Sequence, residues 1–256
     1  MNTNFFKEID LNNKSLLSIP KSTLVDTPSL LIKNASNTNL FEDFINTAIS
    51  FGDYLDYDKK PYKLFDEDSQ QEIEYHSDGV SCIDLKRIPK LLFFFAKSWP
   101  INLGGNFKFS YTPNIVSLLP SSIIHLMKNQ KLQFYNYAGT HRKFIKPKNI
   151  DGDVMVFEKY ALSKVDGEYK IDLFLPLDKI TSDIKWDYLM KFEDLSFEES
   201  NKILVQIKKI AISKYCKKEL PLKNNDILIL NNNLFLHGRK AFSQKIKREL
   251  YRIQIL

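Results

Sequence analysis

The sequence has few cysteines and glycines and no long apolar segment. Its two cysteines, Cys82 and Cys216, cannot supply the disulfide framework of a small secreted protein or a CxxC metal site. The first residues, MNTNFFKEID, lack the apolar core of a signal peptide. No segment reaches the roughly 20 apolar residues that a membrane helix needs. We therefore expect a cytoplasmic protein that does not associate with membranes.

The composition is that of a folded protein. The chain has 256 residues, of which 43% are hydrophobic and 13% aromatic, enough for the core of one large domain. The net charge of +6 comes largely from scattered lysines, without an Arg-rich helix or a basic-aromatic repeat, so we do not expect nucleic-acid binding. The lysines between 143 and 148 are typical of a solvated surface, and an acidic carrier protein is the alternative partner for them.

Short strand-like segments predominate on both sides of one long helix. The helix is predicted at 197–216, because Ser196 and Glu199 form a capping-box pattern and apolar residues recur at helical spacing. A further helix is predicted at 39–55, and one or two more within 112–129, interrupted at Pro120. Strands are expected at 75–83, 90–97, 106–111, 131–139, 153–162, 169–176, twice within 224–242, and at 248–256.

This order of elements predicts an α+β, mainly β fold, a double-stranded β-helix (jelly roll) with flanking helices. We expect one domain over 1–256, with a helical insert at about 182–217. The polar, acidic residues 56–75 are predicted to form a loop.

The segment EYHSDGVSC places His76 and Asp78 two residues apart, in a chain with four histidines. In a strand, residues i and i+2 leave the same face, so both side chains could reach one ion. His237, in LFLHGRKAF, is the candidate third ligand. Two histidines and one carboxylate hold non-haem Fe(II) and leave coordination positions open. On these residues alone, a local His-Asp hydrogen bond is the competing interpretation.

Two arginines follow His237 in a predicted strand. Arg248 lies eleven residues after His237 and Arg252 four residues further on, so strand alternation would place both on one face. A guanidinium binds a carboxylate through two parallel hydrogen bonds, which suits a dicarboxylic co-substrate.

These segments, in this order, resemble the taurine dioxygenase and clavaminate synthase-like family of Fe(II)/2-oxoglutarate-dependent oxygenases. The resemblance covers about residues 40–256 and is carried by HSDG (76–79), PINLGGNF (100–107), NDILILNNNLFLHGRKAF (225–242) and RELYRIQIL (248–256). The third segment departs from the family pattern at Asn225 and Asn231, which stand where Gly and Asp are expected, whereas Asn232 stands where Asn is expected.

The resemblance implies a role for each matching residue. His76, Asp78 and His237 would bind Fe(II), Arg248 the distal carboxylate of 2-oxoglutarate, and O2 would be the oxidant. Arg252 matches a position that often faces the primary substrate, with a structural salt bridge as its alternative. The family commonly has GGxT, whose threonine also contacts 2-oxoglutarate. Phe107 replaces that threonine here, and Ser110, Thr112 or a nearby tyrosine are candidate substitutes.

The resemblance implies oxidation of a small substrate. Related halogenases replace the ligand carboxylate with a small residue, so Asp78 favours hydroxylation or desaturation. An amino acid or a natural-product intermediate is the expected substrate class. Two other functions fit the residues less well, a non-catalytic jelly-roll binding protein and an iron enzyme that does not use 2-oxoglutarate. His125 and His141 are expected to have structural or surface roles, and both cysteines to be small core residues.

Overall fold

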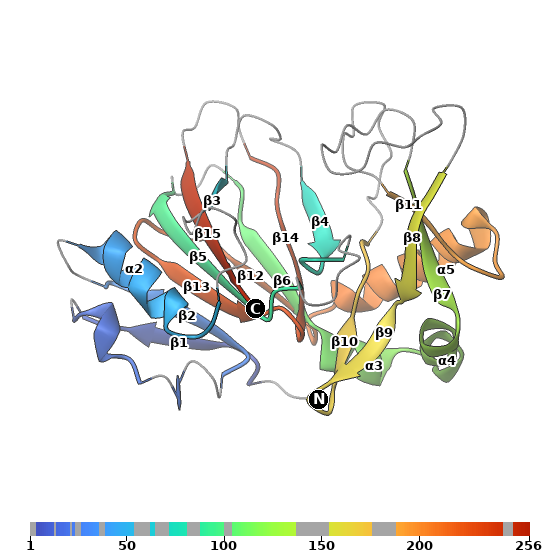
Figure 1. The fold of residues 1–256 in the computed structure, drawn as a ribbon, viewed down its shortest axis with the longest axis horizontal. Coiled ribbons are helices and arrows are strands. Elements are labelled where there is room, and N and C mark those ends of the chain that lie inside the picture. Colours follow the sequence, from blue (N-terminus) through green and yellow to red (C-terminus); the bar gives the residue numbers. More distant parts are fainter. Residues whose placement is uncertain are drawn as a thin grey trace.

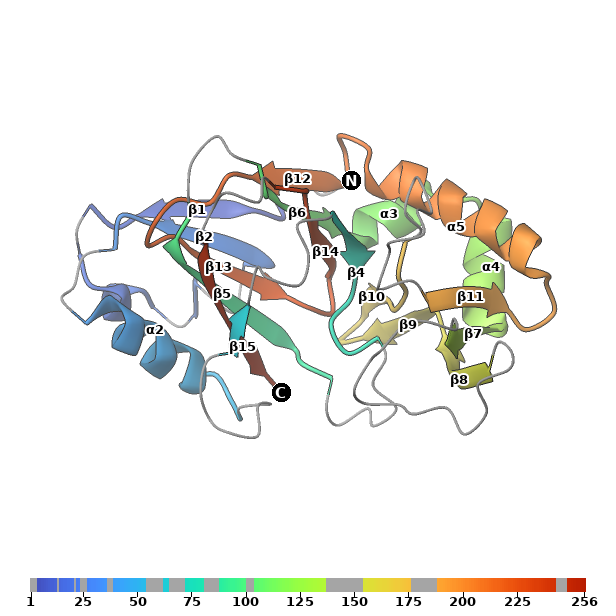
Figure 2. The same ribbon diagram turned by 90° about the horizontal axis from the view of Figure 1, so that it is seen from above.

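Two packed β-sheets form the centre of the molecule, and helices and further strands flank them (Figures 1 and 2). The structure is a computed structural model. It describes residues 4–12, 14–20, 22–23, 27–35, 39–53, 62–64, 72–80, 88–99, 104–136, 154–175, 188–242 and 248–256.

The larger sheet has the strand order β1-β2-β13-β5-β15-β3. Strands β1 and β2 pair in parallel, and every other pair in this sheet is antiparallel. Its longest strand, β5, contains the apolar run LLFFFA, which is buried as a strand between two neighbours must be. The strands are β1 (Lys7–Asp10), β2 (Ser29–Lys33), β3 (Tyr62–Leu64), β5 (Leu91–Ser98), β13 (Ile227–Asn231) and β15 (Glu249–Ile255).

The smaller central sheet has the order β12-β6-β14-β4, and all its pairs are antiparallel. Its strands are β4 (Ile73–His76), β6 (Phe107–Tyr111), β12 (Lys217–Leu220) and β14 (Phe235–Arg239). One face packs against the larger sheet, as alternation along each strand allows. The shared core contains Leu92, Phe94, Leu228, Leu230 and Leu250 from the larger sheet and Phe107, Phe109, Tyr111, Leu220 and Phe235 from the smaller one.

Helix α2 (Leu40–Ile49) covers the outer face of the larger sheet. Its buried residues Phe44 and Ala48 pack, next to the 3-10 helix η1 (Leu16–Ser18), against the alternate side chains of the sheet. These are Leu30, Ile32, Phe93, Phe95, Ile227, Ile229, Ile253 and Ile255. Both faces of the larger sheet are therefore buried.

A second group of elements packs against the outer face of the smaller sheet, on the right in Figure 1. It comprises a three-stranded sheet in the order β11-β7-β8, the β9–β10 hairpin, and three helices. The elements are α3 (Thr112–Leu118), α4 (Ser121–Asn129), β7 (Lys131–Asn136), β8 (Val154–Tyr160), β9 (Leu162–Val165), β10 (Glu168–Ile171), β11 (Tyr188–Phe192) and α5 (Phe197–Ala211).

The structure confirms a mainly β chain with flanking helices. The break at Pro120 separates α3 from α4, and the capping box of Ser196 and Glu199 opens α5. Four predictions were wrong in detail. β4 spans Ile73–His76 instead of 75–83, β3 lies within the predicted loop, and α5 ends at Ala211, before a turn that leads into β12. Strand β11 lies within the range predicted as a helical insert. Among the described residues, no helix has the length and apolar character to cross a membrane.

Candidate metal centre

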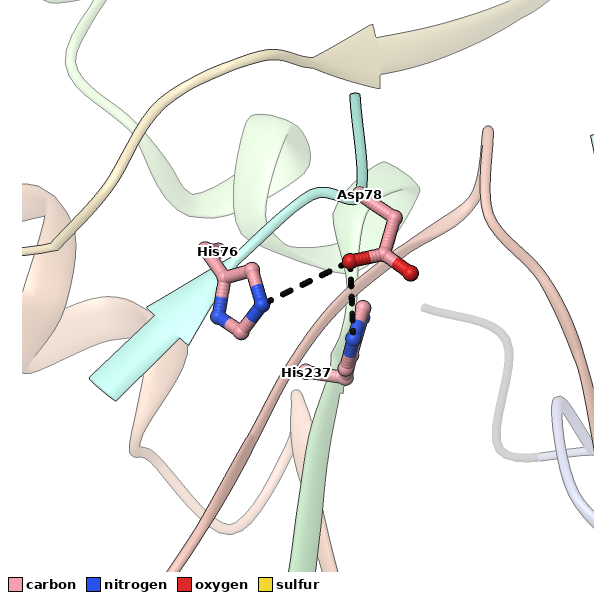
Figure 3. Close-up of side chains that lie close together, drawn as sticks. All are labelled: His76, Asp78 and His237. Atoms are coloured by element: carbon pink, nitrogen blue, oxygen red, sulfur yellow. Dashed lines mark ion pairs between the residues drawn. The ribbon is translucent and has the colours of Figure 1, made fainter. Parts of the chain in front are cut away.

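His76 and His237 lie opposite each other on neighbouring strands. In the antiparallel pairing of β4 with β14, these two residues are register partners, and their ring centroids are 4.5 Å apart. Both rings turn toward one carboxylate oxygen of Asp78 (Figure 3). Oδ1 of Asp78 lies 3.7 Å from Nε2 of His76 and 3.8 Å from Nε2 of His237. Two distant segments thus bring three potential metal ligands together.

Asp78 lies in a turn beyond the end of β4, so strand alternation alone does not place it beside His76. The side chain of Asn232 fixes this turn. Its Oδ1 accepts a hydrogen bond from the Asp78 N–H (3.0 Å), and its Nδ2 donates to the carbonyls of Asp78 (2.9 Å) and Pro89 (2.8 Å). Asn232 is buried, and these bonds tie the turn that carries Asp78 to the segment before His237.

The other carboxylate oxygen of Asp78 contacts strand β15. Oδ2 accepts hydrogen bonds from Nη1 of Arg252 (2.9 Å) and from Nε2 of Gln254 (2.8 Å). The salt bridge that was the alternative for Arg252 is therefore present, with Asp78 as its partner. The sequence predicted neither the contact of Gln254 nor that of Asn232 with the turn. Asn232 stands in a recognisable motif, whereas nothing in the local pattern around Gln254 distinguishes it from a surface residue of a strand.

The electrostatic environment holds the site in the protonation states of metal ligands. Burial opposes ionisation of Asp78, but the Arg252 guanidinium and the two histidines outweigh it and hold the pKa of that carboxyl well below its usual range. Burial lowers the pKa of His237 to about 3. An ionised carboxylate and a neutral imidazole both offer lone pairs to a cation.

The hydrogen bond of His76 fixes which of its ring nitrogens has a lone pair. Nδ1 lies 2.9 Å from the Glu74 carbonyl oxygen, which can only accept, so Nδ1 carries the hydrogen and Nε2 is free to bind a metal. In His237, Nδ1 is buried and has no hydrogen-bond partner among the described residues, and Nε2 faces Asp78. Two imidazole nitrogens and one carboxylate oxygen are the donor set of a non-haem Fe(II) site.

Arg248 lies one residue before β15 and is buried. Its guanidinium carbon is 4.5 Å from the centroid of the Trp99 ring and 3.7 Å from that of Phe242, so two aromatic faces hold it. The register of β15 against β5 shifts between Glu249 and Leu250, where Lys97 of β5 is passed over, so the extra residue lies in β5 and not between the two arginines.

The GGNF segment contacts this arginine. Gly105 has φ of +76°, and a Cβ there would lie 2.4 Å from Nη1 of Arg248. The absence of a side chain at Gly105 therefore makes room for the guanidinium. The two sequence motifs that the family resemblance links to 2-oxoglutarate meet in space.

Phe107 lies beside the candidate ligands. Its ring is parallel to that of His237, with the centroids 6.0 Å apart, and it also contacts Phe94. Two of the candidate substitutes for the missing threonine make contacts elsewhere. Ser110 donates to the Ala211 carbonyl and Thr112 to the Tyr169 carbonyl.

The structure describes one of the two other histidines, His125, and one of the two cysteines, Cys216. His125 is exposed on α4 and pairs with Asn129, and Cys216 is buried in the core, as predicted. His141 and Cys82 lie outside the described residues, as do residues 143–148 and the start of the PINLGGNF motif.

Comparison with other proteins gives one family. The model of the "Taurine catabolism dioxygenase TauD, TfdA family" matches residues 46–254, most of the chain. A search of curated proteins gave no significant match.

Several solved structures share the fold at low sequence identity. PvcB from Pseudomonas aeruginosa is similar with a TM-score of 0.73 and 16% identity, covering 98% of this chain and 86% of that one. A second PvcB structure, described as an Fe, alpha-ketoglutarate dependent oxygenase from an isonitrile synthetic pathway, gives 0.72 and 17% over the same shares. A taurine dioxygenase from Burkholderia xenovorans gives 0.66 and 14%, covering 98% and 85%.

The family match spans both candidate histidines, Asp78, Arg248 and Arg252. The chain therefore belongs to the TauD/TfdA dioxygenase family and is an Fe(II)- and 2-oxoglutarate-dependent oxygenase that uses O2.

Proposed function

We propose that His76, Asp78 and His237 are the iron ligands of this oxygenase. The observation that carries the proposal is that Oδ1 of Asp78 faces Nε2 of both histidines, at 3.7 and 3.8 Å. These separations are too long for hydrogen bonds, and all three ligand atoms lie within 4.8 Å of one another. Three protein ligands on one side of the ion would leave positions for a co-substrate and O2.

Arg248 is the proposed partner of the distal carboxylate of 2-oxoglutarate. Its guanidinium lies over the rings of Trp99 and Phe242, so a carboxylate would approach it along the guanidinium plane, where the N–H donors lie. Phe107 replaces the threonine whose hydroxyl helps to orient 2-oxoglutarate in other members. Here the aromatic contacts of Arg248 would hold the guanidinium that orients the co-substrate. Arg252 remains a proposed substrate contact, which it would make in addition to its bond with Asp78.

Bound Fe(II) and 2-oxoglutarate would supply the oxidising chemistry, and the chain's own residues would orient and shield it. Asp78 stays ionised and His237 neutral at neutral pH, so neither has to lose a proton before binding the ion. Phe94, Phe107 and Phe174 lie against the two histidine rings and would limit the access of water from that side of the site.

The proposed substrate is a small molecule, an amino acid or a natural-product intermediate, that undergoes hydroxylation or desaturation. The similarity to PvcB, an oxygenase of an isonitrile synthetic pathway, supports a biosynthetic role. A carrier-bound form of the substrate is a further proposal, resting on the lysines between 143 and 148.

We also propose a jelly-roll topology, a single domain and a cytoplasmic location. The two facing sheets, with a shared core, support a jelly roll formed by one domain over 1–256, with residues 182–217 as an insert. The low cysteine content supports a cytoplasmic location.

The test is succinate formation from 2-oxoglutarate with added Fe(II) and O2, including the slow turnover without primary substrate. Asp78→Ala should abolish it because the carboxylate ligand is lost. Arg248→Ala should raise the 2-oxoglutarate concentration needed by about 30- to 150-fold, the effect of losing a charge-assisted bidentate contact. Arg248→Lys, which keeps the charge but not the fork, should give an intermediate effect.

Lys202→Ala, on the exposed face of α5, is the matched control and should change nothing. Undiminished succinate formation by Asp78→Ala would overturn the ligand assignment. If Arg248→Ala needs no more 2-oxoglutarate than wild type does, only the assignment of that arginine would be overturned.

A further inference from the structure

The two oxygens of Asp78 lie in different surroundings. Oδ1 faces the two histidine Nε2 atoms, whereas Oδ2 accepts two hydrogen bonds, at 2.9 Å from Arg252 and 2.8 Å from Gln254. Asp78 itself is buried. The carboxylate is therefore divided between a side that faces the candidate metal site and a side that is bound to strand β15.

Strand β15 fixes where these two donors lie. Arg252 and Gln254 are two residues apart and point to the same face, while Ile253 and Ile255 point to the opposite face and pack toward α2. The pairing of β15 with β5 sets Arg252 opposite Phe94 and Gln254 opposite Leu92. Both donors thus come from a paired strand with a buried opposite face, which limits their movement.

We propose that Gln254 is a positioning residue for the metal ligand Asp78. Its amide and the Arg252 guanidinium hold Oδ2, so that Asp78 binds iron through Oδ1 alone. This inference rests on the proposed ligand role of Asp78. A carboxylate that is free to rotate can bind a cation with both oxygens, and would then take a coordination position that the co-substrate or O2 needs.

The chemistry of the amide suits this role. Arg252 already supplies one positive charge opposite the single negative charge of Asp78. A glutamine adds a second hydrogen-bond donor without a second positive charge. Charge balance around the carboxylate is kept, and both strong interactions of Oδ2 point away from the histidines.

The experiment measures the affinity of the metal-free protein for Fe(II) under anaerobic conditions, without 2-oxoglutarate. Gln254→Leu removes the donor and keeps the approximate size of the side chain, and should weaken binding about 10-fold, as loss of contacts behind metal ligands does. Gln206→Leu, the same change at an exposed position of α5, is the matched control and should bind like wild type.

A second readout separates positioning from general damage. Co(II) substituted into each variant reports coordination number in its visible spectrum, and Gln254→Leu should show a spectrum altered toward higher coordination while Gln206→Leu does not. Wild-type affinity together with a wild-type Co(II) spectrum in Gln254→Leu would overturn the inference. If instead wild type binds no metal, or Asp78→Ala binds as tightly as wild type, the proposed ligand set itself fails.

Discussion

Gly238, the residue after His237, has no room for any side chain. A Cβ there would lie 2.4 Å from the Ile73 carbonyl oxygen, 2.9 Å from that of Glu74, and 2.9 Å from Cε of Lys108. Strand β4 can approach β14 closely only because this position carries a hydrogen. That approach sets His76 opposite His237.

We predict that Gly238→Ala weakens Fe(II) binding by at least about 10-fold, because the added methyl group must displace the strand that carries His76. It should also lower the free energy of unfolding by about 1–3 kcal/mol, as overpacking does. Anaerobic metal titration and chemical denaturation measure the two effects.

Gly167→Ala is the control for this prediction. Gly167 has φ of +86° with nothing within 4 Å of the added Cβ. The substitution should reduce stability through backbone strain and leave metal affinity unchanged. Equal metal affinity in both variants would show that the close approach at Gly238 does not position His76.

Asn225 illustrates how one residue can replace another when the backbone demands it. It stands where the family pattern has glycine, and its φ is +68°. After glycine, asparagine is among the residues that adopt this left-handed conformation most readily. The departure from the pattern therefore preserves the turn before β13.

At the scale of elements, helix α5 has a complete N-terminal cap. The Glu199 N–H donates to the Ser196 hydroxyl, and the Glu199 carboxylate accepts from the Ser196 N–H. Two backbone N–H groups that the helix itself leaves without acceptors thereby gain hydrogen-bond partners.

Ser196→Ala should lower the free energy of unfolding by about 1 kcal/mol, because the N-cap acceptor is lost. Urea denaturation followed by circular dichroism measures this difference. Lys202→Ala, which removes only the exposed ion pair with Glu198, should have a much smaller effect. Equal effects would mean that the cap contributes nothing beyond helix propensity.

The elements that the sequence predicts well have strong local signals. The apolar runs of β5 and β13, the alternation in β15, Pro120 and the capping box each act within a few residues. Strands β1, β2, β3, β11 and β12 were not predicted, because they are three to five residues long and become strands only by pairing with distant segments.

The same distinction applies to the site. His76, Asp78 and His237 could be named from motifs, but strand alternation does not explain the position of Asp78, which depends on the long-range bonds of Asn232. The contact of Gln254 with Asp78 spans 176 residues and follows from how β15 lies beside the turn. No local pattern carries that information.

At the scale of the whole molecule, Glu74 connects β4, the strand that carries His76, to two other elements. Its carboxylate forms ion pairs with Lys108 of β6 and Lys208 of α5, both at 3.0 Å. The side chains of all three residues are at most 10% exposed. The ion pairs of Glu74 therefore join the smaller sheet to the helices on its outer side.

Glu74→Ala should reduce the free energy of unfolding by about 3 kcal/mol, because it leaves two buried ammonium groups without this carboxylate. Denaturant titration of the metal-free protein measures the loss. Glu8→Ala, which removes a partly exposed pair with Lys33 in the larger sheet, is the control and should cost much less. A similar loss in the two variants would contradict a connecting role for Glu74.

The central claim is that His76, Asp78 and His237 bind iron and that 2-oxoglutarate can bind to this iron. The most direct measurement is an anaerobic titration of the Fe(II)-loaded protein with 2-oxoglutarate, followed by visible absorption. We predict a metal-to-ligand charge-transfer band in the wild-type protein that is absent from Asp78→Ala. Absence of the band from wild-type protein with iron demonstrably bound would contradict the account.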